Sequence, residues 1–334
     1  MALLDVRNLS VEFPQRRGVL KALDQVSFSI EAGEILGLVG ESGAGKSLTG
    51  ASIIGLLEPP GRISEGEISL GGQRIDALPA EAMRHVRGKR IGAIFQDPLT
   101  SLNPLLSVGH QLTQTILAHL PVSAQEARQR AVQLLQDTGI PAAAERMSHY
   151  PHQFSGGMRQ RVVIALALAA EPELIIADEP TTALDVSIQA QIIELLKRLC
   201  HQRGAAVMLI THDMGVIAEA CDRVGVMYAG RLVEVGAVQQ VIHAAHHPYS
   251  RGLMASIPST EVTRERLHQI PGSMPRLTAI PGGCAFHPRC EHASAQCVSA
   301  RPVLAQDSTS GSHHPVACWH PLRASRLSTQ EVSV

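Results

Sequence analysis

The stretch that decides the fold of this chain reads Gly40-Glu41-Ser42-Gly43-Ala44-Gly45-Lys46-Ser47. It fits the pattern G-x-x-x-x-G-K-[ST], in which successive backbone N–H groups surround phosphate oxygens. An apolar run at residues 35–39 leads into it and predicts a buried strand, and a helix is expected to begin at about Lys46. Within this pattern Lys46 is the cation expected on the β- and γ-phosphates, and the Ser47 hydroxyl is the expected Mg²⁺ ligand.

A pair of acidic residues, Asp178 and Glu179, ends a second apolar run at residues 174–177. Ligands bind at the carboxyl ends of strands in open α/β sheets, so this pair is expected beside the phosphate loop. We expect Asp178 to hold Mg²⁺ and Glu179 to polarise the attacking water as a general base. Taken alone, the pair also fits an ordinary acidic turn before Pro180.

Two further polar residues follow predicted strands: Gln96 after residues 90–95, and His212 after residues 206–210. The flexible amide of Gln96 can bind Mg²⁺ or water. A neutral His212 imidazole can reach a γ-phosphate and hold the attacking water in line. Each of the two also fits a plain polar residue at the end of a strand.

A predicted helix opens at Ser155-Gly156-Gly157. The free N–H groups and the positive dipole end of a helix start favour an anion, and glycines allow close backbone approach. Without the other motifs, the same three residues fit a helix cap followed by flexible glycines.

The order of these segments predicts an α/β fold with a parallel sheet covered on both faces, because strands and helices alternate. Residues 4–13 and 26–30 alternate apolar and polar side chains and are predicted to be half-buried strands. Helical patterns over residues 123–139 and from Ser155 predict a helical subdomain inserted between the Gln96 and Asp178 strands. A further helix is expected over residues 187–200.

Composition narrows the class of protein. The 334 residues carry a formal net charge of −1 and only 3% aromatic residues, which argues against a nucleic-acid partner. The longest apolar run, Val162–Ala170, is about half the ~20 residues that a membrane-spanning helix needs. The first residues do not resemble a secretory signal. We therefore expect a protein of the cytoplasm that depends on other chains for any membrane spans.

Six cysteines are present, and four of them cluster late in the chain as C-x5-C-x6-C-x20-C: Cys284, Cys290, Cys297 and Cys318. Clustered cysteines in a reducing compartment indicate a metal or cluster site more often than disulfides. Four thiolates fit a [4Fe–4S] cluster or Zn²⁺, and unligated thiols are the third possibility.

Together and in this order, the motifs resemble those of an ABC-transporter ATPase subunit. They look like that family's Walker A loop (Gly40–Ser47), Q-loop (Gln96), signature (Ser155–Gln160), Walker B pair (Asp178-Glu179), D-loop (Thr182–Asp185) and switch histidine (His212). The resemblance implies a P-loop ATPase with a RecA-like parallel-sheet core, an antiparallel β subdomain, an inserted helical subdomain and a C-terminal cysteine-containing extension. It also implies that Phe13 stacks on adenine. The alternative is that Phe13 is an ordinary core residue of its strand.

Three segments look like the dipeptide and oligopeptide import branch of that family, which also handles nickel and related small solutes: Phe95–Pro104, residues 177–191, and His247-Pro248-Tyr249 followed by the cysteines. That branch implies ATP and Mg²⁺ as cofactors, and its C-terminal extension is associated with an iron–sulfur cluster. It implies a head-to-tail dimer with a paralogous subunit or with itself, in which Ser155 and Gly157 face the partner's nucleotide. It further implies two membrane permease subunits, an extracytoplasmic solute-binding protein and a peripheral place on the cytoplasmic face of the membrane.

We expect a nucleotide-binding domain over 1–245, with its helical subdomain at about 97–170, an extension over 246–325 and a flexible tail over 326–334. Nucleotide binding is expected to survive loss of any cysteine ligand, because the cysteines lie outside the nucleotide motifs. The resemblance implies the ATP-hydrolysing, energy-coupling subunit of an importer for dipeptides, oligopeptides or a related small solute. A soluble non-transport ABC ATPase and the ATPase of an exporter are the alternative functions. A non-catalytic binding module is a further alternative, disfavoured by Glu179 and His212.

Overall fold

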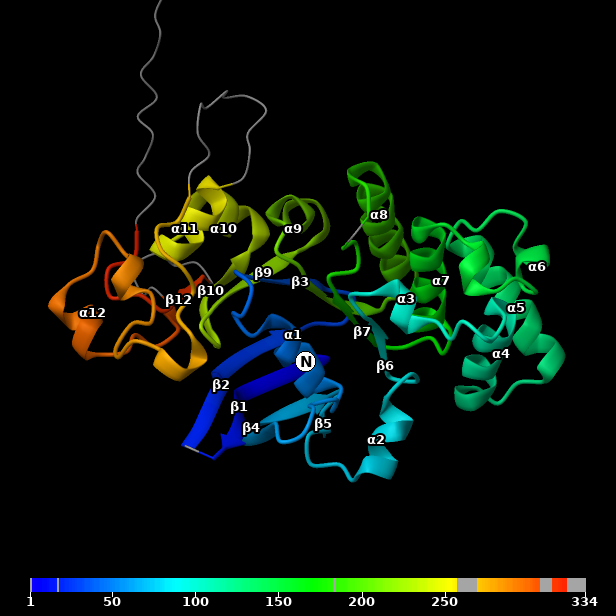
Figure 1. Ribbon diagram of the computed structural model, residues 1–334, viewed down its shortest axis with the longest axis horizontal. Coiled ribbons are helices and arrows are strands. Elements are labelled where there is room, and N and C mark those ends of the chain that lie inside the picture. Colours follow the sequence, from blue (N-terminus) through cyan, green and yellow to red (C-terminus); the bar gives the residue numbers. More distant parts are fainter. Residues whose placement is uncertain (1, 17, 183, 257–268, 307–313, 323–334) are drawn as a thin grey trace, which may run out of the picture.

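Two β-sheets organise the part of the chain that the computed structural model describes, which is residues 2–16, 18–182, 184–256, 269–306 and 314–322 (Figure 1). One is an antiparallel sheet of four strands in the order β2-β1-β4-β5. The other has eight strands in the order β11-β12-β10-β9-β3-β8-β7-β6. The expected tail over 326–334 lies outside the described residues.

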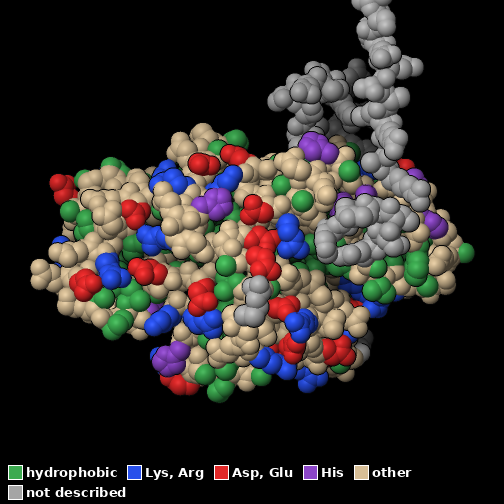
Figure 2. All heavy atoms as spheres, turned by 180° about the vertical axis from the view of Figure 1, so that it is seen from behind, with side chains coloured by type: hydrophobic (Ala, Val, Ile, Leu, Met, Phe, Trp, Pro, Cys, Tyr) green, Lys and Arg blue, Asp and Glu red, His purple; other side chains and the backbone are tan. Residues whose placement is uncertain are grey.

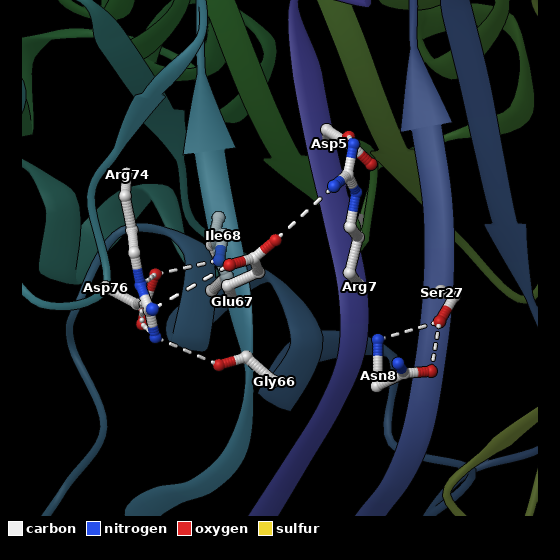
Figure 3. A network of polar contacts seen from close by, with 9 residues as sticks. All are labelled: Asp5, Arg7, Asn8, Ser27, Gly66, Glu67, Ile68, Arg74 and Asp76. Atoms are coloured by element: carbon white, nitrogen blue, oxygen red, sulfur yellow. Dashed lines mark hydrogen bonds and ion pairs between the residues drawn. The ribbon is translucent and has the colours of Figure 1, made fainter.

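The antiparallel sheet is built from β1 (Leu4–Gln15), β2 (Gly18–Ile30), β4 (Arg62–Leu70) and β5 (Gln73–Arg74). Apolar side chains of its long strands are buried in the core, whereas polar side chains line the opposite face, as alternation requires. Figure 3 shows that polar face, where Arg7 lies 2.6 Å from Asp5 and Arg74 contacts both Glu67 and Asp76.

The larger sheet contains β3 (Ile35–Val39), β6 (Ile91–Ile94), β7 (Leu174–Asp178), β8 (Ala206–Ile210), β9 (Arg223–Tyr228), β10 (Arg231–Ala237), β11 (Ala305–Gln306) and β12 (Pro315–Val316). Its strands β9, β3, β8, β7 and β6 are mutually parallel. Side chains of β3 alternate between two cores, with Ile35 and Val39 in one and Leu36 and Leu38 in the other. The sheet is therefore covered on both faces, as predicted.

Helices cover this sheet and form the inserted block: α1 (Lys46–Ile53), α2 (Ala80–Val86), α3 (Pro98–Ser101), α4 (Val108–His119), α5 (Ala124–Asp137), α6 (Ala143–Arg146), α7 (Gly156–Leu168), α8 (Val186–Arg203), α9 (Met214–Ala220) and α10 (Val238–Ala244). The segments α3 to α7 lie together at one end of the molecule (Figure 1). The predicted helix starts are confirmed, since Ser123 and Ser155 cap α5 and α7 through their side chains.

Two sequence expectations differ in detail from the structure. The strand predicted over residues 26–30 begins at Gly18, because the whole of β2 pairs with β1 as a long hairpin. The large sheet is not purely parallel, because β10, β12 and β11 extend it in antiparallel order beyond β9. The predicted parallel arrangement holds only for the strands from β9 to β6.

Residues of the C-terminal extension form α11 (Pro248–Ala255), α12 (Ala295–Ser299), β11, β12 and two short 3₁₀ turns, η2 (Leu277–Ala279) and η3 (His287–Arg289). Another such turn, η1 (Pro151–Gln153), precedes α7. The extension shares a sheet with the nucleotide domain, since Val316 of β12 pairs with Glu234 of β10.

The Glu234 carboxylate is buried and accepts hydrogen bonds from the backbone of His246 and His247, and His314 Nε2 lies 2.7 Å from it. The rings of Tyr228, Tyr249 and Phe286 also pack together across the same boundary. The face turned away in Figure 1 carries acidic and basic side chains interspersed over its surface (Figure 2).

Candidate nucleotide site

The Gly40–Ser47 loop connects β3 to α1, as predicted, and forms one wall of a cleft of about 610 Å³. Three of its glycines, Gly40, Gly43 and Gly45, have positive φ angles, which other residues rarely adopt. At Gly45 a Cβ atom would also lie 2.6 Å from Leu23 Cδ2, so the loop requires glycine there for space as well as for backbone conformation. Gly40 and Ala44 are buried beneath the loop, whereas Ser42 and Gly43 are exposed at its tip.

Lys46 is the first residue of α1 and is only 7% exposed. Its ammonium donates to the carbonyl oxygens of Gly40 at 2.9 Å and Glu41 at 3.2 Å, which folds the loop around it. Burial lowers the pKa of Lys46, and the carboxylates of Glu179 and Asp178 oppose that shift. A phosphate anion provides the compensating charge that such a buried cation requires.

Ser47 and Asp178 meet across the cleft, where the Ser47 hydroxyl donates to Asp178 Oδ1 at 3.0 Å. Burial raises the pKa of Asp178 and the neighbouring Glu179 charge adds to that, while the Ser47 hydrogen bond opposes it. Hydroxyl and carboxylate oxygens are the ligands that Mg²⁺ takes in phosphate sites, and a cation favours the ionised carboxylate. The pair therefore fits a magnesium ion.

Glu179 is the centre of a hydrogen-bond network. Its Oε2 accepts from Gln96 Nε2 and from the Thr182 hydroxyl, both at 2.9 Å, and its Oε1 lies 3.2 Å from His212 Nδ1. The backbone of Glu179 has φ +46°, a conformation that costs energy in a residue with a side chain and that is common at functional sites. Gln96, Glu179 and His212, which are far apart in sequence, are thus in direct contact.

Burial opposes ionisation of Glu179, but the hydrogen bonds from Thr182 and His212 outweigh it and lower the pKa of this carboxyl. An ionised carboxylate is the form that accepts a proton from water, so its protonation state suits a general base. From sequence, Thr182 is only the first residue of the segment that resembles a D-loop, and its contact with Glu179 is not expected. Its position three residues after Glu179, at the first turn beyond the strand, is the signal that could have indicated one.

The far wall of the cleft comes from the antiparallel sheet and from the extension. Beyond the phosphate loop, the cleft is lined by Phe13, Gln15, Leu20, Ala22 and Pro60 on the side of the antiparallel sheet, by Leu48 of α1, by Gln96 and Glu179 after β6 and β7, and by Leu277 of the extension. Phe13 thus contributes an aromatic side chain to the lining of this cleft. Leu277 belongs to η2 of the extension, a contribution that no sequence motif indicated.

Ser155, Gly156 and Gly157 do not belong to the set of described residues that line this cleft. Ser155 Oγ accepts from the Met158 backbone N–H at 3.3 Å and so caps α7, while Ser155 and Gly156 are exposed. A Cβ atom at Gly157 would lie 2.9 Å from Ile188 Cγ2, which explains that glycine by packing. These three residues present a helix start to the surface instead of to the phosphate loop of their own chain.

Glu41, expected to bind nucleotide, directs its carboxylate into an ion pair with Arg289 at 2.8 and 2.9 Å. Its backbone N–H donates to the Tyr249 hydroxyl at 2.9 Å. Both partners belong to the C-terminal extension and lie outside every nucleotide motif of the sequence. Glu41 therefore contributes to the loop through its backbone, and its side chain makes a contact within the protein.

The four clustered cysteines line one cavity, together with His247, Phe286, His287, His292 and His320. Cys284 donates its backbone N–H to Cys297 O at 2.8 Å, which joins the two halves of the segment. Burial raises the pKa of Cys318 to about 11, so as a free thiol it would remain protonated. The other two cysteines are distant core residues, and burial raises the pKa of Cys200 to about 12.

Comparisons with known proteins agree with this geometry. Residues 23–182 match the ABC transporter family, and residues 233–297 match the oligopeptide/dipeptide transporter C-terminal region. The ATP-binding cassette MJ0796, in its dimeric post-hydrolysis state with ADP and Pi, superposes with a TM-score of 0.63 at 30% identity, covering 70% of this chain and 98% of that one.

Relatives match nearly the whole chain. It is 44% identical to the dipeptide transport ATP-binding protein DppD of Escherichia coli (strain K12), over 95% of this chain and 98% of that protein. The probable D,D-dipeptide transport ATP-binding protein DdpD of the same organism is 48% identical, over 95% and 96% of the two chains. The oligopeptide transport ATP-binding protein OppD of Escherichia coli (strain K12) is 46% identical, over 96% of this chain and 94% of that protein.

The fold and the phosphate-loop site define an ABC-type ATPase. The chain belongs to the ABC transporter family, among its dipeptide and oligopeptide transport ATP-binding proteins. Among the described residues, every helix is too short or too polar to span a bilayer.

Proposed function

We propose that this protein is the ATP-hydrolysing, energy-coupling subunit of an importer for dipeptides or oligopeptides. The observation that carries the proposal is the Glu179 carboxylate, held by Gln96, Thr182 and His212 beside the phosphate loop. Similarity to peptide-transport subunits over both the nucleotide domain and the extension favours an importer over a soluble ATPase or an exporter.

In the proposed reaction Lys46 and the loop N–H groups bind the triphosphate, and Ser47 and Asp178 hold Mg²⁺, which neutralises phosphate charge. Glu179 accepts the proton of the attacking water, and His212 and Gln96 orient that water and the carboxylate. Phe13 stacks on the adenine ring. Phe13, Lys46, Ser47, Gln96 and Glu179 line the cleft, and Asp178 and His212 contact Ser47 and Glu179 beside it.

We further propose a head-to-tail dimer with a paralogous subunit or a second copy of this chain. The exposure of Ser155 and Gly156 outside their own cleft supports a role at the partner's nucleotide. Two permease subunits supply the membrane spans and receive solute from an extracytoplasmic binding protein, and this subunit acts at the cytoplasmic face. Domains over 1–245 and 246–325 remain our proposed division.

The function is tested by purifying this chain with the membrane subunits that co-purify with it and reconstituting them in vesicles with the solute-binding protein. We expect ATP-dependent accumulation of dipeptides or oligopeptides, and no accumulation when this chain carries Lys46→Ala. Uptake that is independent of ATP, or ATP-dependent uptake of other solutes only, would overturn the proposal.

We also propose that Cys284, Cys290, Cys297 and Cys318 hold one [4Fe–4S] cluster, with Zn²⁺ as the alternative. Four thiols lining one cavity are a suitable donor set.

Protein purified without oxygen is expected to be brown and to contain about four irons per chain. Cys290→Ala should remove most of the iron, because the cluster loses one thiolate. Cys200→Ala, a core cysteine far from the cavity, is the matched control and should retain it. Iron and zinc are measured by elemental analysis: stoichiometric zinc without iron would replace the cluster with a structural zinc site, and absence of both would refute a metal at these cysteines.

A further inference from the structure

One arginine of the cysteine-containing extension reaches the phosphate loop. Arg289 ends η3 and immediately precedes Cys290. Its Nη1 donates to Glu41 Oε2 at 2.8 Å and its Nη2 donates to Glu41 Oε1 at 2.9 Å. This bidentate geometry is the strong form of an arginine–carboxylate pair.

Several contacts hold the Arg289 side chain in one place. Its Nε donates to Pro271 O at 2.7 Å, and Nη1 also contacts the Tyr228 hydroxyl at 3.3 Å. The guanidinium lies 5.8 Å from the ring centroids of both Tyr228 and Phe286. The side chain is only 7% exposed, so this pair is screened less by solvent than a surface salt bridge.

Glu41 is the second residue of the phosphate loop, and its backbone belongs to the nucleotide site. Its carbonyl oxygen accepts from Lys46 Nζ at 3.2 Å and from the Ala44 N–H at 3.1 Å. Its carboxylate is therefore a negative charge carried by the loop that is proposed to bind the triphosphate. An unpaired carboxylate in that position repels the nucleotide, and a guanidinium bound to it cancels the repulsion.

We propose that Arg289 is a positioning residue of the nucleotide site: it neutralises Glu41 and holds that charge away from the phosphates, so the extension increases the affinity for nucleotide. The inference rests on the proposed role of the Gly40–Ser47 loop. From sequence, the nucleotide motifs and the cysteine segment were expected to act independently. The ion pair connects them directly, and loss of a cysteine ligand that displaces Arg289 is then expected to weaken nucleotide binding without abolishing it.

The test measures the dissociation constant of a fluorescent ATP analogue for the purified full-length chain. Arg289→Ala is expected to raise it about tenfold, because the Glu41 carboxylate is left unpaired. The double variant Glu41→Gln/Arg289→Ala should return to within about twofold of the parent, because the repelling charge is gone. A purely structural role for Arg289 would not be rescued by removing its partner.

Two further variants keep the test decisive. Arg301→Ala is the matched control: Arg301 lies in the same extension and pairs with Asp24 at 3.1 Å, so its loss should leave the affinity within about twofold. Glu41→Gln alone keeps Arg289 and should bind at least as tightly as the parent. This variant decides the question even if Arg289→Ala fails to fold, since a tenfold loss in Glu41→Gln would overturn the charge argument.

Lys46→Ala separates the inference from the proposed function. If Lys46→Ala loses nucleotide binding while Arg289→Ala keeps the parent affinity, the role of Arg289 is wrong and the site stands. If Lys46→Ala binds like the parent, the proposed site itself is wrong. A double variant as weak as Arg289→Ala would also overturn the inference.

Discussion

A Glu179→Gln variant is expected to bind ATP like the parent and to hydrolyse it about 10²–10⁴ times more slowly, the usual cost of removing a general base. The amide has the same shape as the carboxylate, so contacts with Gln96 and Thr182 can persist in altered form. It cannot accept the proton of the attacking water. The measurement is phosphate release by the assembled transporter, with nucleotide binding measured in parallel.

The matched control is Glu173→Gln, which makes the same chemical change just before β7 begins. Glu173 pairs with Arg90 at 2.8 Å and is 44% exposed, so its loss should leave the hydrolysis rate close to that of the parent. Hydrolysis by Glu179→Gln at the parent rate would show that another group is the base.

A Ser155→Arg variant is expected to reduce hydrolysis by about 10²-fold, similar to the loss of a preorganised hydrogen-bond donor in an active site. The long cationic side chain would occupy the start of α7, where the partner's nucleotide is proposed to dock. The defect should appear at the site whose phosphate loop lies across the interface, and nucleotide binding to the isolated chain should be unchanged. Phosphate release and ATP-dependent dimer formation are the two measurements.

Two variants separate this role from capping of α7. Ser155→Asp keeps a side-chain oxygen that can cap the helix but brings a negative charge against the phosphates, so it should be inactive as well. Ser148→Arg introduces the same bulk at an exposed serine of the inserted block and should remain active. Cross-linking that joins position 155 to Lys46 within one chain, instead of between chains, would contradict the head-to-tail arrangement.

Strand and helix boundaries near the site were predictable because local rules control them. The apolar run at β3, the glycines with positive φ and the serine caps of α5 and α7 each follow from a few adjacent residues. The joining of Ser47 to Asp178 and of Glu179 to His212 was also predictable, since parallel strands bring their carboxyl ends to one edge of the sheet.

By itself, the sequence determined the α/β core, the phosphate loop and the acidic pair. Backbone conformation and hydrophobic period depend on short segments, and the order of strands and helices along the chain follows from them. Only the tertiary structure decided that Arg289 pairs with Glu41, 248 residues away, and that β12 joins β10. Such contacts have no period or spacing in the sequence. They depend on how the extension packs against the nucleotide domain, where burial of Tyr249 and Phe286 places a charged side chain beside the loop.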